Sequence, residues 1–152
     1  MKKVRDINIS YIFTTRVFRV ILSFALLSVG CFIYIMYRQE SLLMFRCFDE
    51  LGLSDLVHHL RSTGTEHSLF DWVKNSLPDG LWLFSYMFLI DAIWNGDKSF
   101  SYYFFLWLLP CIALLSEVLQ AFGVVPGVYD FIDIMCYSGA IIVFIILKFI
   151  IK

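Results

Sequence analysis

The sequence predicts an all-α integral membrane protein with four transmembrane helices, on three observations. The chain of 152 residues is 60% hydrophobic and only 16% charged, which leaves too few polar side chains to cover a soluble domain of this size. The charged residues crowd the N-terminus and the middle of the chain, so that long apolar runs remain between them. These runs lack the alternation of apolar and polar residues that marks a membrane β-barrel strand. We therefore expect one membrane domain over residues 1–152.

Four apolar runs are long enough to cross the hydrocarbon core, which takes about 20 residues of helix. They cover residues 17–37, 77–94, 100–122 and 131–151, approximately. The first run continues beyond Cys31 and is not ended by a small-residue cleavage site, so we expect a retained helix rather than a signal peptide. Pro110 lies inside the third run and predicts a bend there.

The distribution of basic residues predicts the orientation. With four spans the two termini lie on one side of the membrane, and eight of the 12 Lys and Arg residues fall on that side: Lys2, Lys3, Arg5, Arg16, Arg19, Lys98, Lys148 and Lys152. The other basic residues lie in the first connection. Since basic residues concentrate on the cytoplasmic side, we expect a multi-pass protein of the cytoplasmic (inner) membrane with both termini in the cytoplasm.

The first connection, about residues 39–76, is expected to lie at the outer membrane surface as amphipathic helices. The stretch "SLLMFRCFDELG" predicts a short helix that ends at Gly52. Ser68 and Asp71 have the spacing of a capping box that opens another helix, with Phe70 and Trp72 beside Lys74. Aromatic and basic side chains together suit the headgroup region. Whether these helices cover the bundle or gate a ligand site is left open.

Four acidic residues are expected to gather near the outer ends of the spans. The second span runs inward, the third outward and the fourth inward again, which places Asp79, Glu117, Asp130 and Asp133 at one end. Asp91 is expected at the opposite interface, within reach of Lys98 or water. The sequence therefore predicts a carboxylate cluster whose assembly does not depend on the absolute orientation.

Helix capping explains some of these acids but not all. Asp79 falls in the first turn of its helix, and Asp130 is placed to cap the fourth helix with Asp133 at the N3 position. Glu117 lies near a helix C-terminus, where the helix dipole disfavours an anion. An ionisable residue in a span that capping cannot explain is a candidate for function. Gln120 shares its helix face and is placed to hydrogen-bond it or a ligand.

Glu117 and Gln120 in "SEVLQAF", Asp130 and Asp133 in "YDFID", and Gly139 in "SGA" resemble the pattern of the VanZ-like family over the last two helices. That family consists of small multi-helix membrane proteins, and its founding member is associated with resistance to the glycopeptide antibiotic teicoplanin. The resemblance implies a cell-envelope protein. The family usually has an arginine where this chain has Gly127, and an asparagine where it has Tyr137.

Two classes of function follow. In the first, a polar cleft near the outer leaflet binds a polar lipid headgroup, an envelope precursor or an amphiphilic drug, through Glu117, Gln120 and Asp133 with Asp130 and Asp79 beside them. In the second, the chain is a membrane subunit of a larger assembly or an oligomeric pore, and the acids line a cation or proton path. An enzyme is the less favoured interpretation, because no nucleophile or metal set accompanies the carboxylates.

The remaining composition limits cofactors and partners. The three histidines have no zinc-site spacing, so we expect no metal and no cofactor. A net charge of -1 gives no reason to expect nucleic acid as a partner. The expected partners are membrane lipid and either another protein or further copies of this chain.

Overall fold

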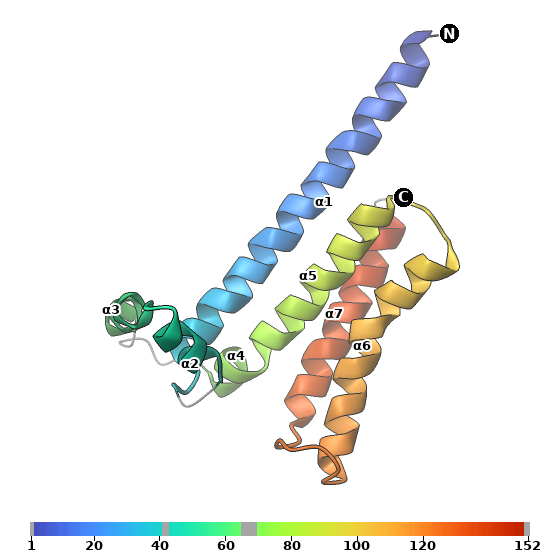
Figure 1. Cartoon of the computed structure of the whole chain (residues 1–152). Helices are drawn as coiled ribbons and strands as arrows, with labels where there is room; N and C mark the ends of the chain where they lie inside the picture. Colours follow the sequence, from blue (N-terminus) through green and yellow to red (C-terminus); the bar gives the residue numbers. More distant parts are fainter. Residues whose placement is uncertain (1, 41–42, 65–69, 151–152) are drawn as a thin grey trace.

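A computed structural model describes residues 2–40, 43–64 and 70–150, and within these ranges the chain forms seven helices and no strand (Figure 1). In chain order they are α1 Lys2–Tyr37, α2 Leu43–Glu50, α3 Ser54–Gly64, α4 Asp71–Asn75, α5 Leu77–Trp94, α6 Phe100–Ala121 and α7 Phe131–Ile150. The four long helices, α1, α5, α6 and α7, match the four predicted spans in position. The first is longer than predicted, because the helix begins at Lys2.

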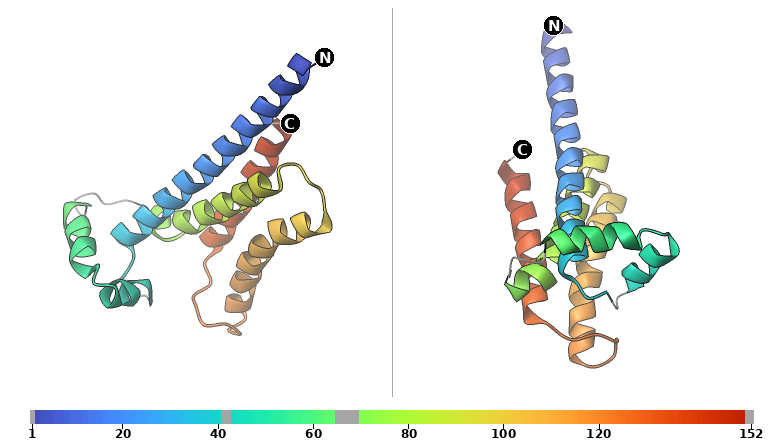
Figure 2. Two further views of the ribbon diagram at one scale, coloured as in Figure 1. Left: turned by 45° about the horizontal axis from the view of Figure 1, so that its top comes forward. Right: turned by 90° about the vertical axis from the view of Figure 1, so that its left-hand side faces the viewer.

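The four long helices alternate in direction along the chain (Figures 1 and 2). The C-terminal end of α7 therefore lies toward the end of the bundle from which the N-terminal part of α1 projects. α5 occupies the centre, packing against α1, α6 and α7, and α6 also packs against α7. Each end of the bundle is thus built from residues far apart in the sequence.

Three helices are long and apolar enough to cross a membrane: Arg16–Tyr37 of α1, Phe100–Ala121 of α6 and Phe131–Phe149 of α7. α5 has the predicted boundaries but is not among these three helices, and it carries Asp79 in its first turn and Asp91 near its end. It is also the most enclosed of the long helices, with half of its 18 residues buried. The long helix with two acids is therefore the one most covered by protein.

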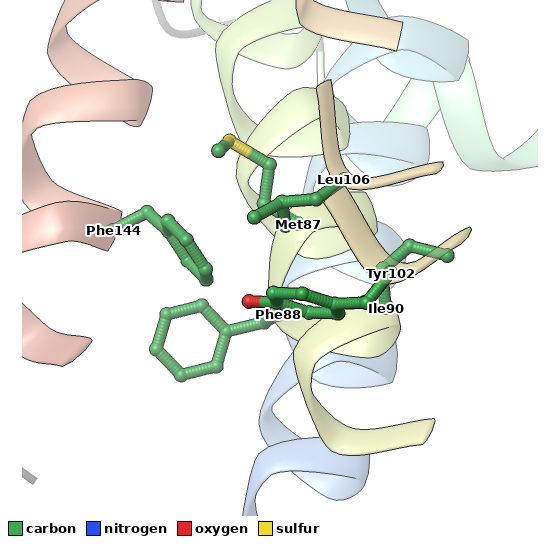
Figure 3. Close-up of a cluster of buried hydrophobic side chains, with 6 residues drawn as sticks. All are labelled: Met87, Phe88, Ile90, Tyr102, Leu106 and Phe144. Carbon is green, nitrogen blue, oxygen red and sulfur yellow. The ribbon is translucent and has the colours of Figure 1, made fainter. Parts of the chain in front are cut away.

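An apolar core holds α5, α6 and α7 together (Figure 3). It contains Met87, Phe88 and Ile90 of α5, Tyr102 and Leu106 of α6, and Phe144 of α7. The rings of Phe88 and Phe144 meet edge to face, with centroids 5.6 Å apart. The outward faces of α6 and α7 are also apolar, and they expose Phe104, Ile112, Leu115, Met135, Ile142 and Ile146 among others. A bundle that is apolar outside as well as inside suits a hydrocarbon surrounding.

Two glycines allow close helix contacts with α5. A Cβ on Gly30 of α1 would lie 2.6 Å from Nε1 of Trp82, and a Cβ on Gly80 would lie 3.1 Å from Cβ of Cys136 in α7. Small residues at such contacts are how membrane helices approach closely. The expected bend at Pro110 has a counterpart in α6, which curves along its length (Figure 1) and buries this proline fully.

The described part of the first connection contains three helices, α2, α3 and α4, of which α3 was not predicted. α2 ends before Gly52, as predicted, where φ is +69° and a glycine is favoured. α3 was missed, because its sequence "SDLVHHLRSTG" has no sustained apolar stripe. α4 begins at Asp71, whereas Ser68 of the predicted capping box lies outside the described residues.

Arg61 attaches α3 to the end of α1. Arg61 of α3 donates to the carbonyl oxygen of Ile35 at 2.5 Å and lies 3.2 Å from the Glu40 carboxylate. On their other faces the short helices expose large apolar side chains, including Leu43, Leu51, Leu56, Phe70 and Trp72.

We predict that Gly80→Val destabilises the protein by about 1–3 kcal/mol, because the added methyl groups would force α5 away from α7. Gly139→Val is the matched control: it makes the same substitution in the membrane-length part of α7, where an added Cβ would have no neighbouring atom within 4 Å. Thermal unfolding of both purified variants in detergent measures the difference. Equal loss of stability in both would contradict the close contact between α5 and α7.

Candidate functional site

Three carboxylates meet at the end of the bundle formed by the last turns of α1 and α6 and the first turns of α5 and α7. Asp79 lies in the first turn of α5, Glu117 near the end of α6, and Asp133 in the first turn of α7. The three are close enough to act on one another electrostatically. We call these residues the carboxylate cluster. Together with Asp130, these are the acids that the sequence places near one end of the bundle.

Glu117 is the most buried member, with 4% of its surface exposed. Its Oε2 accepts a hydrogen bond from the backbone N–H of Asp130 at 3.3 Å. A buried carboxylate near a helix C-terminus is costly, and one long hydrogen bond offsets only part of that cost. The position of Glu117 is therefore not explained by local helix chemistry.

Asp130 has a structural role beside the cluster. Its Oδ1 accepts from the backbone N–H of Ile132 at 2.8 Å, as an N-cap does at the start of α7. The predicted capping role is confirmed. The side chain of Asp130 caps α7, and its backbone N–H donates to Glu117 in α6. Asp130 therefore holds the α6–α7 turn against the cluster.

Arg38, directly after α1, brings a positive charge to this end of the bundle. Nη2 of Arg38 lies 3.6 Å from Oδ2 of Asp79 and donates to the carbonyl oxygen of Asn75 at 3.0 Å. From the sequence, Arg38 was expected only as a charge of the first connection. The signal that could have identified it is its place directly after α1, since the end of α1 lies beside the start of the antiparallel α5.

Gln120 lies beside the cluster and packs against the turn that follows α6. Its side-chain amide packs against the backbone at Gly127, where φ is +149° and a Cβ would lie 2.6 Å from Cδ of Gln120. Between these two described residues, Gln120 and Glu117, there is no hydrogen bond. Gly127 therefore accommodates Gln120 in the turn, at the position where the VanZ-like pattern has an arginine.

Unsatisfied polar atoms concentrate at this same end. Among the described residues, four buried side-chain atoms lack a hydrogen-bond partner: Nε of Arg38, Oγ of Ser76, Nε1 of Trp82 and Oδ1 of Asp133. All four belong to the end of α1, the first half of α5 or the start of α7. Buried polar atoms are nearly always hydrogen-bonded in folded proteins, so an accumulation of exceptions marks a place where water or a ligand is needed.

The opposite end of the bundle is organised around Asp91, which we call the Asp91 network. Asp91 was expected within reach of Lys98 or water, but it is only 8% exposed and its side-chain partners come from three other helices. Its Oδ2 accepts from Arg19 of α1 at 2.6 Å. Its Oδ1 accepts from the Tyr102 hydroxyl of α6 at 2.8 Å and lies 3.0 Å from Nζ of Lys148 in α7.

Further contacts order the cations of the Asp91 network. Nη2 of Arg19 donates to Oδ1 of Asn95 at 3.3 Å. The Lys148 ammonium bonds the Tyr102 hydroxyl and lies 4.5 Å from the centre of the Tyr102 ring. In the sequence, Arg19 and Lys148 indicate only the orientation of the chain. Their pairing depends on the packing of α1 and α7 on α5, which no local pattern encodes.

No protein-family model, curated protein or solved structure matches this chain. In the part of the chain that the structure describes, no three His, Cys, Asp or Glu residues are placed to hold a metal ion. The charges of the site indicate what it could bind. The carboxylate cluster has three acids against one arginine, which favours a positively charged group.

We predict that Asp91→Asn destabilises the protein by about 3 kcal/mol, because Arg19 and Lys148 would be left close together without the anion between them. The double variant Asp91→Asn/Lys148→Gln should recover part of that loss. Asp97→Asn, an exposed acid at the same end, is the control and should change stability by less than about 0.5 kcal/mol. Thermal unfolding in detergent distinguishes the three, and a neutral Asp91→Asn would contradict the role of the network.

Proposed function

We propose that this protein crosses the membrane four times and binds, at its carboxylate cluster, an amphiphile with a positively charged headgroup. The observation that carries the proposal is Oδ1 of Asp133, a buried carboxylate oxygen without a hydrogen-bond partner among the described residues, in a cluster of three acids with one arginine beside it. Oγ of Ser76, which is completely buried, is a second oxygen without a partner. A ligand with a cationic headgroup that donates hydrogen bonds would satisfy these oxygens, whereas Nε of Arg38 and Nε1 of Trp82 are donors and need acceptors.

Three features support α5 as a fourth crossing. It runs beside three helices of membrane length and alternates in direction with its neighbours in the chain (Figure 1). Its 18 residues span about 27 Å, close to the thickness of the hydrocarbon core. Its two acids are partnered by α1, α6 and α7, which is how charged residues are accommodated inside membrane bundles.

The charge of the proposed ligand follows from the unequal number of acids and bases. Among the described residues, Asp79, Glu117 and Asp133 face Arg38 alone, and the Arg38–Asp79 distance of 3.6 Å is long for a hydrogen bond. Burial in a region of low dielectric constant disfavours the ionised forms of these acids, so a cation that pairs with them would be bound favourably. The exposed apolar side chains of α6 beside this end would contact the hydrocarbon part of the ligand.

This proposal is compatible with a divergent member of the VanZ-like family. Four of the residues that carry the resemblance, Glu117, Gln120, Asp130 and Asp133, lie at one end of the bundle, where Glu117 and Asp130 are directly bonded. Arg38 supplies a cation in a chain that lacks the family's usual arginine. We further propose that this end faces the outer leaflet, with α2, α3 and α4 resting at the membrane surface through their exposed apolar side chains.

The proposed orientation places both termini in the cytoplasm. Cys47 of α2 is exposed in the first connection, whereas Cys31, Cys111 and Cys136 lie in α1, α6 and α7. We predict that a membrane-impermeant maleimide labels Cys47 in intact cells, and that Cys47→Ser removes the label. Labelling confined to inverted membrane vesicles would reverse the orientation, but it would leave the carboxylate cluster unchanged.

We predict that Glu117→Gln preserves folding but weakens binding of dodecylammonium, a cationic amphiphile whose headgroup donates hydrogen bonds, by about tenfold or more, as expected when one partner of a buried charge pair is lost. Asp133→Asn should act in the same direction. Equilibrium dialysis in detergent micelles measures binding, and thermal unfolding measures folding. Glu117→Leu should bind as weakly and be no less stable, since it removes a buried charge whose cost serves binding alone.

Asp71→Asn is the matched control for these variants, because Asp71 is exposed on α4, outside the cluster. It should bind the probe as the unmodified protein does. Full binding in both Glu117→Gln and Asp133→Asn would show that the cluster does not recognise cations.

A further inference from the structure

The Asp91 end of the bundle has an excess of positive charge. Arg19 and Lys148 both bond the single carboxylate of Asp91, at 2.6 Å and 3.0 Å. Arg16 lies one turn before Arg19 on α1 and donates to the carbonyl oxygen of Ile93 at 3.4 Å. Three cations therefore surround one anion.

The adjoining α5–α6 connection does not remove this excess, since its Asp97 and Lys98 carry opposite charges. A single buried carboxylate needs only one cation for charge balance, so the further cations are not explained by the burial of Asp91.

The cations keep access to the surroundings while their positions are held by the network. The Lys148 side chain is 40% exposed and that of Arg19 is 15% exposed, against 11% for Asp91. Arg16 is exposed. The ammonium of Lys148 has three N–H donors and bonds Asp91 and Tyr102 among the described residues, which leaves one donor for a ligand. Asp91 thus orients the two cations without covering them.

Aromatic side chains mark this end as a membrane–water boundary. Trp94 ends α5, Phe100 begins α6, and the ring of Tyr103 follows one turn further on; Phe100 and Tyr103 are exposed. Trp and Tyr gather at the level of the headgroups. Exposed cations at that level, ordered between helices, are the chemistry that holds an anionic headgroup.

We propose that Arg16, Arg19 and Lys148 bind the phosphodiester group of an anionic membrane lipid. Arg19 and Lys148 approach the phosphate from α1 and α7, and Arg16 adds a donor one turn along α1. The proposal requires that the bundle lies in a membrane, but it does not depend on the ligand of the carboxylate cluster or on which end faces the cytoplasm.

The test titrates phosphatidylglycerol into the purified full chain in phosphatidylcholine nanodiscs, with bound lipid counted by native mass spectrometry. Arg16→Gln removes a cation that bonds the Ile93 carbonyl rather than Asp91, so it leaves the network intact. Lys148→Gln removes a second cation and keeps a donor for Asp91. Each should weaken phosphatidylglycerol binding about fivefold, the effect of one basic residue near an anionic headgroup.

Lys74→Gln is the control, because Lys74 lies on α4 at the other end of the molecule and pairs with Asp71. It should leave the lipid affinity unchanged, and so should Glu117→Gln, so that this proposal and the cation-binding proposal fail separately. Equal affinity for phosphatidylglycerol and phosphatidylcholine, or unchanged affinity in both Arg16→Gln and Lys148→Gln, would overturn it. If millimolar inorganic phosphate competed as effectively as the lipid, the site would bind free phosphate and the lipid would not be its ligand.

Discussion

The structure depends on one constraint: the two carboxylates of α5 must be partnered by other helices. Asp79 and Asp91 are separated by about 18 Å along the helix axis, by its rise per residue. Neither can be satisfied within α5, and leaving a charge unpartnered in a medium of low dielectric constant costs several kcal/mol. Arg38, directly after α1, pairs with Asp79 at one end of the bundle. At the other end Asp91 is bonded by Arg19 of α1, Tyr102 of α6 and Lys148 of α7. These contacts fix both the neighbours of α5 and their registers.

This constraint explains why α5, the long helix with two acids, is central. A helix with two acids would be poorly placed against lipid, but inside the bundle its polar groups meet partners from α1, α6 and α7. α6 and α7 carry their polar contacts near the bundle ends and can expose Phe104, Ile112 and Ile142 elsewhere. Gly80 then brings α5 close enough to α7 for packing to add to the ion pairs. Polar pairing and close packing therefore select the same arrangement.

The sequence predicted the long helices well, because their boundaries depend on local signals. The apolar run, Pro78 and Asp79 located α5, and Asp130 marked the start of α7. The convergence of Asp79, Glu117 and Asp133 also followed, since it requires only alternating helix directions. The partners of the acids could not be predicted in this way. Arg19, Arg38 and Lys148 lie between 41 and 72 residues from the acids they reach, and which face of each helix turns inward is decided by packing across the bundle. The orientation of Gln120 depended on the conformation of Gly127, which the sequence did not reveal.

The two ends of the bundle differ in a way that stability alone does not require. At Asp91 the carboxylate accepts bonds from three side chains, and none of the four unpartnered buried atoms of the described residues lies there. At the carboxylate cluster the acids outnumber the bases, and all four of those atoms are found. If burial of charge were arranged only to hold helices together, both ends would be expected to balance charge and to satisfy their polar atoms. At the first end the cations are in excess and none of the four unpartnered buried atoms is found, whereas the second end has carboxylates in excess and donors and acceptors without partners. The cluster is therefore the end at which polar burial is least compensated within the protein, and this imbalance is the basis of the proposal that it binds a cation.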